Sequence, residues 1–452
     1  MITQLAFASI GELAGRLRSG EISAASLVQC YADRISTLNP TSKAFISLDI
    51  DRARATAESL EIGTADGLLK GMPYACKDLF DVEGIATTAG SRVLADNIAE
   101  HDADVISRMN QAGAIFIGKN NLHEFAYGAT GENTLYGTAP NPYNQSRLAG
   151  GSSSGSAAAV GYGLCVAALG TDTGGSVRAP AALCGLVGFK PTFGRISTEG
   201  VIPYSWSLDH VGTLTRSAAD TALLFNTLAS NVQTPAVAKL EGLRIGIPED
   251  FFFERADTEI LDSIDRLMNF LRGAGAKLIP VTMPSMEHSR TVSLTVQMPE
   301  ALSYHSRYLV QRGNLYSRDF RAGLALGQCL LAEQYIRAKR FIESYRREMD
   351  KAFDGIDLLL TPATPAIAPK IGTVEVTIDG ETEPAGNAIT RYTSFFNMTG
   401  HPAIILPCGM HSEGLPIAAQ FIGKHFGDEQ LIAAATLIES SYDFKLPLPD
   451  IK

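Results

Sequence analysis

The sequence predicts an α/β protein built on an open sheet. In the second half of the chain, three patterns follow one another: an apolar strand ("LRIGIPEDFF"), an amphipathic helix ("LDSIDRLMNFLRGAGA") and a second strand ("KLIPVTM"). This alternation is typical of a sheet with helices packed against it. Two later apolar runs that end at prolines, "DLLLTPATPA" and "PAIILPC", are expected to complete the same sheet.

The elements ahead of this region follow from local patterns. Ser9 and Glu12 form a capping-box pattern at the start of an amphipathic helix, and "SLVQCYADRI" and "DRARATAESL" predict further helices of an outer layer. From Gly71 to about Thr215, short apolar runs such as "AIFIGK" and "LCGLVGFK" alternate with glycine-rich turns, as in buried strands near a site. Residues 301–353 are expected to be largely helical, with the basic run "RAKRFIESYRREMDK" on a solvated face.

The composition is that of a well-buried enzyme. The chain has 452 residues, which suits one large domain or a few ordinary ones, and 45% of the residues are hydrophobic while 19% are charged. These values exclude a mainly disordered chain. The net charge of −10 disfavours a broad nucleic-acid-binding surface.

Cysteine usage and the apolar runs predict a cytoplasmic location without membrane contact. Six cysteines are spread thinly and form no C-x-x-C pair, so we expect free thiols in a reducing compartment. The N-terminus lacks the pattern of a secretory signal, in which a basic opening precedes an apolar core. The longest low-polarity run, residues 157–170, is shorter than the roughly 18 residues of a spanning helix.

The stretch "LAGGSSSGSAAAVGYG" (residues 148–163) raises several hypotheses. The small apolar residues at its end disfavour a flexible linker, and the lack of a Lys-Ser/Thr pair disfavours a phosphate-binding loop. Residues 151–155 match the G-x-S-x-G pattern of a nucleophile elbow, with Ser153 as nucleophile and His401 as an open candidate for its base. The polar segment that precedes the pattern disfavours the elbow, because an elbow follows a strand.

A second glycine-serine cluster, "TDTGGS", makes Ser176 the better candidate nucleophile. Consecutive glycines leave backbone N–H groups open, and such donors stabilise the oxyanion of an acyl-transfer reaction. A serine nucleophile needs a base, and lysine serves in some serine hydrolases. Lys77 ends an apolar run, where burial would lower its pKa, and the alternative is an ordinary ion pair with Asp78 or Asp81.

Two other catalytic patterns each lack a residue. An aspartic protease needs a second segment like "DTGGS", and the sequence has none. In "NLHEFAY", Tyr127 stands where a zinc-binding H-E-x-x-H helix has its second histidine. We therefore expect neither a metal nor another cofactor.

Together these segments resemble the amidase signature family of serine amidohydrolases. Four of them occur in the family's order: "PYACKDLFDVEG", "GGSSSGSAAAV", "GTDTGGSVRAPAALCGLVGFKPTFGRIS" and "SLDHVGTLTRS". The resemblance extends to "NNLHEFAYGATGENTLYG" and "TGHPAIILPC". It implies a single large α/β/α domain over residues 1–452, in which helices cover both faces of a mixed, twisted sheet. Its parts would be an N-terminal helical layer (1–65), a signature core (66–230) and the remaining sheet with a variable helical part (231–452).

By this resemblance, three side chains form a Ser-Ser-Lys triad. Ser176 would be the nucleophile, Ser152 the bridging serine held in a cis peptide, and Lys77 the final base of an acyl-enzyme mechanism. Ser153 and Ser154 would add supporting hydrogen bonds. The oxyanion hole would comprise the backbone N–H groups of Thr173, Gly174, Gly175 and Ser176.

Further residues are expected beside the triad. Asp172 and Arg178 would brace the loop, although Arg178 has a substrate carboxylate as an alternative partner. Aromatic residues flank the motifs, and they tilt the expected substrate weakly toward apolar or aromatic acyl groups. The candidate substrate-binding residues are Tyr127, Gly128, Gly150, Tyr204 and Trp206, with Tyr136 as a further aromatic neighbour.

The expected function is hydrolysis of an amide C–N bond, with anilides and carbamates as further candidate substrates. The alternative is the glutaminase subunit of a tRNA-dependent amidotransferase, whose partner subunits would supply kinase activity and tRNA binding. A catalytically silent binding protein on the same fold is a third hypothesis. For the hydrolase we expect a small-molecule substrate, no direct nucleic-acid or membrane partner, and a monomer or homodimer.

Overall fold

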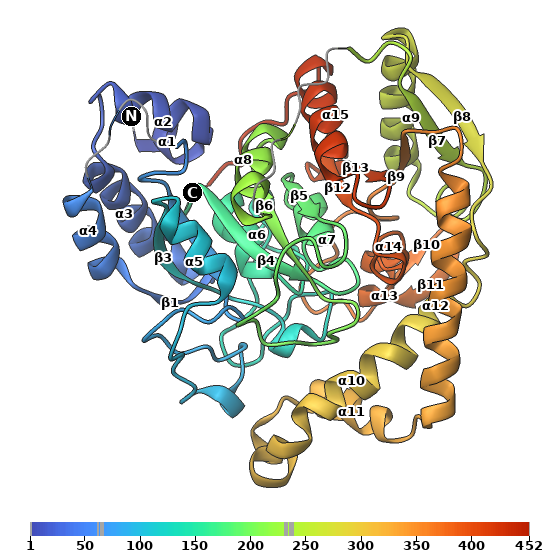
Figure 1. The fold of residues 1–452 in the computed structure, drawn as a ribbon, viewed down its shortest axis with the longest axis horizontal. Helices are drawn as coiled ribbons and strands as arrows, with labels where there is room; N and C mark the ends of the chain where they lie inside the picture. The colour runs from blue at the N-terminus through green and yellow to red at the C-terminus, as the bar shows by residue number, and fades with distance from the viewer. Residues whose placement is uncertain (1, 61–62, 64–66, 230–233, 235–238, 452) are drawn as a thin grey trace.

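A mixed sheet of eleven strands forms the centre of the computed structural model, which describes residues 2–60, 63, 67–229, 234 and 239–451 (Figure 1). Its strands are β1 (Phe45–Leu48), β2 (Pro73–Lys77), β3 (Ile115–Asn120), β4 (Ala167–Asp172), β5 (Val187–Lys190), β6 (His210–Thr215), β7 (Arg244–Pro248), β8 (Lys277–Val281), β9 (Leu358–Pro362), β12 (Ala403–Met410) and β13 (Pro416–Gly423). The order across the sheet is β1-β3-β2-β4-β6-β5-β12-β13-β9-β7-β8. β2 is parallel to β3 and β4, β7 is parallel to β8 and β9, and the pairs from β4 across to β9 are antiparallel.

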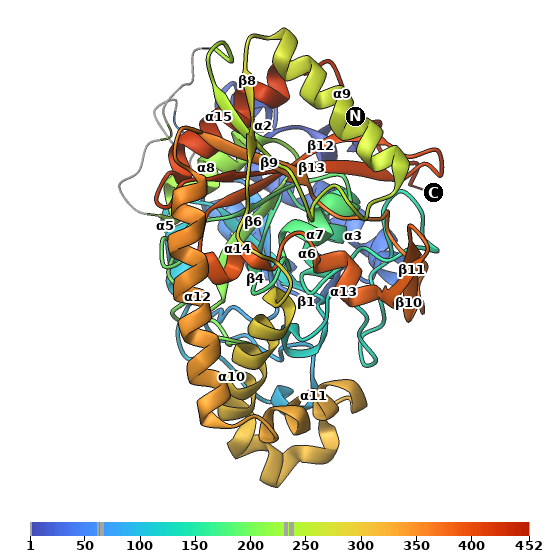
Figure 2. The same cartoon turned by 90° about the vertical axis from the view of Figure 1, so that its right-hand side faces the viewer.

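Two groups of helices cover the sheet. α6 (Ser154–Gly161) and α7 (Arg178–Leu183) contact each other and pack on β2, β4, β5 and β13, whereas α8 (Ala218–Leu228) and α15 (Asp428–Ser441) pack together on β6 and β12. Figure 2 shows the two groups on opposite sides of the sheet, so the mixed sheet with helices on both faces is confirmed. The other elements are α1 (Ile2–Phe7), α2 (Ile10–Arg18), α3 (Ala24–Ser42), α4 (Ile50–Ser59), α5 (Asp104–Gln111), α9 (Thr258–Gly273), α10 (Ser289–Arg312), α11 (Arg318–Gln328), α12 (Ala332–Ala352), α13 (Ala385–Thr390), α14 (Phe395–Thr399), the hairpin β10 (Glu375–Ile378) and β11 (Glu381–Pro384), and three 3₁₀ turns (Arg92–Leu94, Glu124–Ala126 and Gly313–Leu315).

Most of the elements expected from local patterns are present. The strand, helix and strand expected in the second half are β7, α9 and β8, and the two late runs are β9 and β12. Strand β1 lies within the layer expected to be helical. It forms because its backbone pairs with β3, and nothing in the four residues of β1 indicates that pairing. Helices α10, α11 and α12 extend beyond the sheet (Figure 1), and the basic run on α12 is largely solvent-exposed as expected.

The sheet brings the ends of distant strands together. β2 and β4 are fully buried and parallel, so their carboxyl ends lie at the same edge of the sheet, where ligand sites of α/β proteins form. Lys77 is the last residue of β2 and Asp172 the last of β4. The antiparallel strand β6 begins beside them, because His210 pairs with Asp172.

Three further sequence expectations concern the chain as a whole. The expected part boundaries at residues 65–66 and 230–231 lie outside the described residues. None of the six cysteines forms a disulfide bond. Among the helices that the structure describes, none is long and apolar enough to cross a membrane.

Candidate active site

Lys77 lies buried at the carboxyl end of β2 and contacts two hydroxyl groups. Its Nζ donates hydrogen bonds to Ser152 Oγ at 2.7 Å and to Thr171 Oγ1 at 2.8 Å. Burial disfavours the charged form and lowers the pKa of Lys77 from 10.5 to about 7. The amine is therefore partly neutral near pH 7, the form that accepts a proton.

The ion pair considered as the alternative role of Lys77 does not form. Asp78 pairs instead with Lys119, whose Nζ lies 2.9 Å from Asp78 Oδ1. No carboxylate of the described residues, Asp81 included, forms an ion pair with Lys77. The lysine thus contacts hydroxyl groups, which do not hold it in the charged form as a paired carboxylate would. The charges of Asp209 and Asp172, which form no ion pair with Lys77, offset only part of the effect of burial on its pKa.

The serine-rich stretch is a tight loop that leads into α6. The peptide bond between Gly151 and Ser152 is cis. A Cβ atom on Gly151 would lie 2.5 Å from the backbone nitrogen of Gly131, so the close approach of two chain segments requires glycine there. The other two serines brace the loop, because Ser153 Oγ donates to the Thr171 carbonyl and Ser154 Oγ to the Gly131 carbonyl, both at 3.2 Å.

Ser176 lies on the adjoining loop between β4 and α7. The backbone N–H of Ser153 donates to the Ser176 carbonyl at 3.2 Å, which ties the two serine loops together. The hydroxyl of Ser176 makes no hydrogen bond within the described residues, including none with Ser152. It lines a cavity of about 320 Å³, a volume that suits a small molecule.

An ion pair between Asp172 and Arg178 holds the Ser176 loop. Arg178 Nη2 lies 2.9 Å from Asp172 Oδ1, and both side chains are fully buried. Gln420 and Asn397 each accept a further guanidinium hydrogen bond. Arg178 therefore braces the loop and is out of reach of a substrate carboxylate.

The same carboxylate engages one of the four expected oxyanion donors. The N–H of Gly175 donates to Asp172 Oδ1 at 2.8 Å. Among the described residues, the N–H groups of Thr173, Gly174 and Ser176 have no acceptor. Gly175 itself has φ +127°, and a Cβ there would lie 2.0 Å from Thr393 Oγ1, so only glycine fits.

The expected substrate-binding residues lie at three different places in the structure. Tyr127, Gly128 and Tyr204 line the Ser176 cavity. Trp206 lines a neighbouring cavity of about 230 Å³ together with Thr171 and Asp209. Gly150 is buried away from the cavity, and a Cβ atom on it would meet Leu183 and Pro180.

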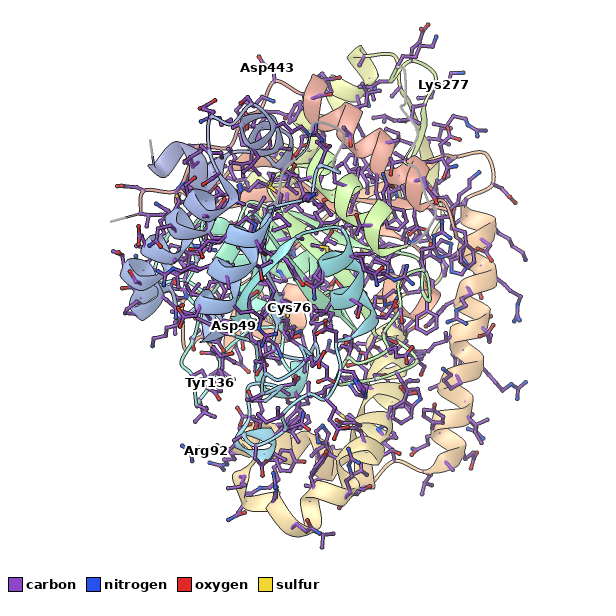
Figure 3. The ribbon with its side chains drawn as sticks, turned by 60° about the vertical axis from the view of Figure 1, so that its left-hand side comes forward. Asp49, Cys76, Arg92, Tyr136, Lys277 and Asp443 are labelled. Carbon is purple, nitrogen blue, oxygen red and sulfur yellow. The ribbon has the colours of Figure 1, made fainter. Side chains whose placement is uncertain are left out.

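Two residues named in the sequence hypotheses lie elsewhere. Figure 3 shows Tyr136 toward the periphery, whereas Cys76, the neighbour of Lys77, lies near the middle of the view and is fully buried. His401 stacks on Phe353 and lies 3.3 Å from Asp350, with no contact to Ser153, so it is not placed to act as the base of a nucleophile elbow. No cluster of metal-ligating side chains occurs in the described part of the chain.

Sequence reasoning missed several polar groups around the site. Asp209 accepts hydrogen bonds from Thr173 Oγ1 at 2.6 Å and from the N–H groups of Tyr204 and Ser205, and burial raises its pKa to about 6. It lies inside the motif "SLDHVGTLTRS", which was a usable signal. Arg290 lines the Ser176 cavity from α10, and no motif surrounds it.

Comparison with known proteins places the chain in a family. Residues 26–432 match the Amidase family model. A glutamyl-tRNA(Gln) amidotransferase subunit from Coxiella burnetii (strain Dugway 5J108-111) is 35% identical over 98% of this chain and 99% of its own length.

Solved structures agree with this match. A crystal structure of an amidase has a TM-score of 0.91 and 35% identity, covering 96% of this chain and 100% of that one. The corresponding glutamyl-tRNA(Gln) amidotransferase subunit from Thermotoga maritima has a TM-score of 0.82 and 29% identity, covering 99% and 98%. Because these matches span nearly the whole chain, the protein belongs to the amidase family, whose members hydrolyse amide C–N bonds.

Proposed function

We propose that this chain hydrolyses a small amide with Ser176 as nucleophile, Ser152 as proton relay and Lys77 as final base. The observation that carries the proposal is the 2.7 Å hydrogen bond between Lys77 and Ser152. The lysine is buried and forms no ion pair with a carboxylate of the described residues. A base with a pKa of about 7 is well matched to proton transfer near neutral pH.

The reaction divides into acylation and deacylation. Ser176 Oγ attacks the amide carbonyl carbon while its proton passes to Ser152 Oγ, whose own proton passes to Lys77 Nζ. The reversed relay protonates the leaving nitrogen, the C–N bond breaks, and an acyl-enzyme ester remains. A water molecule, deprotonated by the same relay, then attacks the ester and releases the carboxylic acid.

The oxyanion of each tetrahedral intermediate needs donors on the Ser176 loop. We assign this role to the N–H groups of Thr173, Gly174 and Ser176, because Asp172 already engages the N–H of Gly175. Such preorganised donors contribute about 3–4 kcal/mol each in acyl-transfer enzymes. Asp172 then serves to fix the loop that presents the three donors.

A second candidate function is the glutaminase subunit of a tRNA-dependent amidotransferase. The full-length likeness to the amidotransferase subunit from Coxiella burnetii supports it, and on the comparisons it is better supported than a broad-range amidohydrolase. The chemistry at Ser176 is the same in both, with ammonia from glutamine as the first product. Partner subunits would then supply the tRNA-dependent steps.

Ammonia release from a panel of amides tests the proposal. The wild-type chain is expected to release ammonia or amine from at least one of glutamine, aliphatic amides, an anilide and a carbamate, and Ser176→Ala to release none. Activity that survives in Ser176→Ala would overturn the nucleophile assignment. Glutamine turnover that depends on added partner subunits would favour the second candidate.

A further inference from the structure

A guanidinium group is the only charged group on the described lining of the Ser176 cavity. Arg290 reaches the cavity from the first turn of α10, and Ser176, Tyr127 and Tyr204 line the same space. The described lining contains no aspartate or glutamate. The cavity therefore carries one positive charge and no negative one.

Arg290 is held in place without a counter-ion. Its Nη2 donates to Asn387 Oδ1 at 2.6 Å and its Nη1 to Thr390 Oγ1 at 3.3 Å. No carboxylate among the described residues forms an ion pair with it, and the nearby Glu383 pairs with Arg391 instead. Two of the five N–H donors of Arg290 are thus used, both on neutral acceptors.

The buried arginine of the same site shows the contrast. Arg178 is fully enclosed and neutralised by Asp172, as a structural arginine should be. Arg290 remains exposed to solvent, and its guanidinium is oriented by two neutral side chains. An oriented, accessible arginine with free donors is the group that binds carboxylates through paired hydrogen bonds.

Two tyrosines lie close enough to Arg290 for its charge to act on them. Burial raises the pKa of Tyr127 and of Tyr204, and the positive charge of Arg290 opposes that rise at both hydroxyls. Neither hydroxyl makes a hydrogen bond within the described residues. An anion beside Arg290 would therefore have further donors within the same cavity.

We propose that Arg290 binds a carboxylate of the substrate, so that the substrate is a small amide carrying a carboxylate and no ammonium group. This inference rests on the proposed function, since it names the substrate class of the same site. A cavity of about 320 Å³ holds a short-chain monoamide of a dicarboxylic acid. The ammonium group of glutamine would find no carboxylate on the described lining.

Four amides of equal chain length separate the charges. Glutaramate carries a terminal carboxylate, pentanamide is neutral, 5-aminopentanamide carries an ammonium group, and glutamine carries both charges. We expect kcat/KM for glutaramate to exceed that for each of the other three by about tenfold or more, the worth of a charge-assisted hydrogen bond. Equal kcat/KM values for glutaramate and pentanamide would overturn the proposal. Equal kcat/KM values for glutamine and glutaramate would overturn the part of it that excludes an ammonium group.

Substitution of the arginine provides the second arm. Arg290→Gln is expected to lower kcat/KM for glutaramate to the value for pentanamide. The kcat/KM for pentanamide should change little in this variant. Arg307→Gln, on the exposed side of the same helix, is the matched control and should leave all four rates unchanged. An Arg290→Gln variant that keeps the preference for glutaramate would contradict the assignment.

A binding measurement distinguishes failure of this inference from failure of the proposed function. Calorimetry on Ser176→Ala is expected to show glutaramate binding at least about tenfold tighter than pentanamide, and Ser176→Ala with Arg290→Gln to lose that difference. If Ser176→Ala binds with this preference but the wild-type chain hydrolyses no amide, the proposed hydrolase function is wrong and the carboxylate site is supported. Equal binding of the two ligands would sink the carboxylate site alone.

Discussion

Asp78 pairs with Lys119 and not with Lys77, its immediate neighbour in the chain. The two partners lie 2.9 Å apart and are fully buried, and the N–H and hydroxyl groups of Thr88 also donate to the Asp78 carboxylate. Asp78 is the first residue after β2, in the turn that follows the strand, and Lys119 and Thr88 hold its carboxylate there. The ion pair with Lys119 thereby engages the carboxylate that directly follows Lys77 in the chain.

Removal of Lys119 should destabilise the fold. Lys119→Met leaves a buried carboxylate without its cation, which costs about 3–5 kcal/mol in proteins. The measurement is the free energy of unfolding in urea. The double variant Lys119→Met with Asp78→Asn should recover part of the loss, whereas an unchanged free energy in Lys119→Met would show that the pair contributes nothing.

Activity should rise with pH through about 7. The neutral amine of Lys77 is the active form, and its pKa is lowered by burial to about 7, so kcat/KM is expected to increase with pH and level off above that value. The negative charge of Asp209 raises the Lys77 pKa. Asp209→Asn should therefore move the midpoint to lower pH. A profile that is flat between pH 5 and 9 would contradict Lys77 as the base.

The same lysine should give stability a pH dependence. The unfolded chain holds the Lys77 proton up to its ordinary pKa of 10.5, whereas the folded chain releases it near 7. Between these values the unfolded state binds more protons, so the free energy of unfolding rises with pH from Lys77. Lys77→Met should remove this contribution. Parallel pH profiles for wild type and Lys77→Met, measured by denaturant unfolding, would count against the lowered pKa.

Ser152 and Ser153 should differ sharply although they are adjacent. Ser152→Ala removes the hydroxyl bonded to Lys77 and should lower kcat by several orders of magnitude, about 10³-fold or more for a triad member. Ser153→Ala removes a single hydrogen bond to the Thr171 carbonyl and should lower it by far less. Equal losses at both positions, joined by a similar loss in His401→Ala, would revive the nucleophile elbow.

Local pattern alone determined much of this protein. Alternation of strand and helix predicted β7, α9 and β8, the glycine-serine cluster "TDTGGS" pointed to Ser176, and the apolar run before Lys77 pointed to a buried lysine. Such features are encoded within a few residues, because periodicity, turn glycines and capping side chains act over short distances. The sequence also indicated that Ser152, rather than Ser153, contacts Lys77, but only through resemblance to a family.

The tertiary structure decided which groups meet. The pairing of Asp78 with Lys119 and the place of Trp206 in a separate cavity depend on how strands and loops stack. Arg290 enters the Ser176 cavity from α10, more than a hundred positions after Ser176 in the chain. Asn387, on α13, accepts a hydrogen bond from its guanidinium group. Contacts between such distant segments leave no local signal in a single sequence, because packing and electrostatics set them only after the chain has folded.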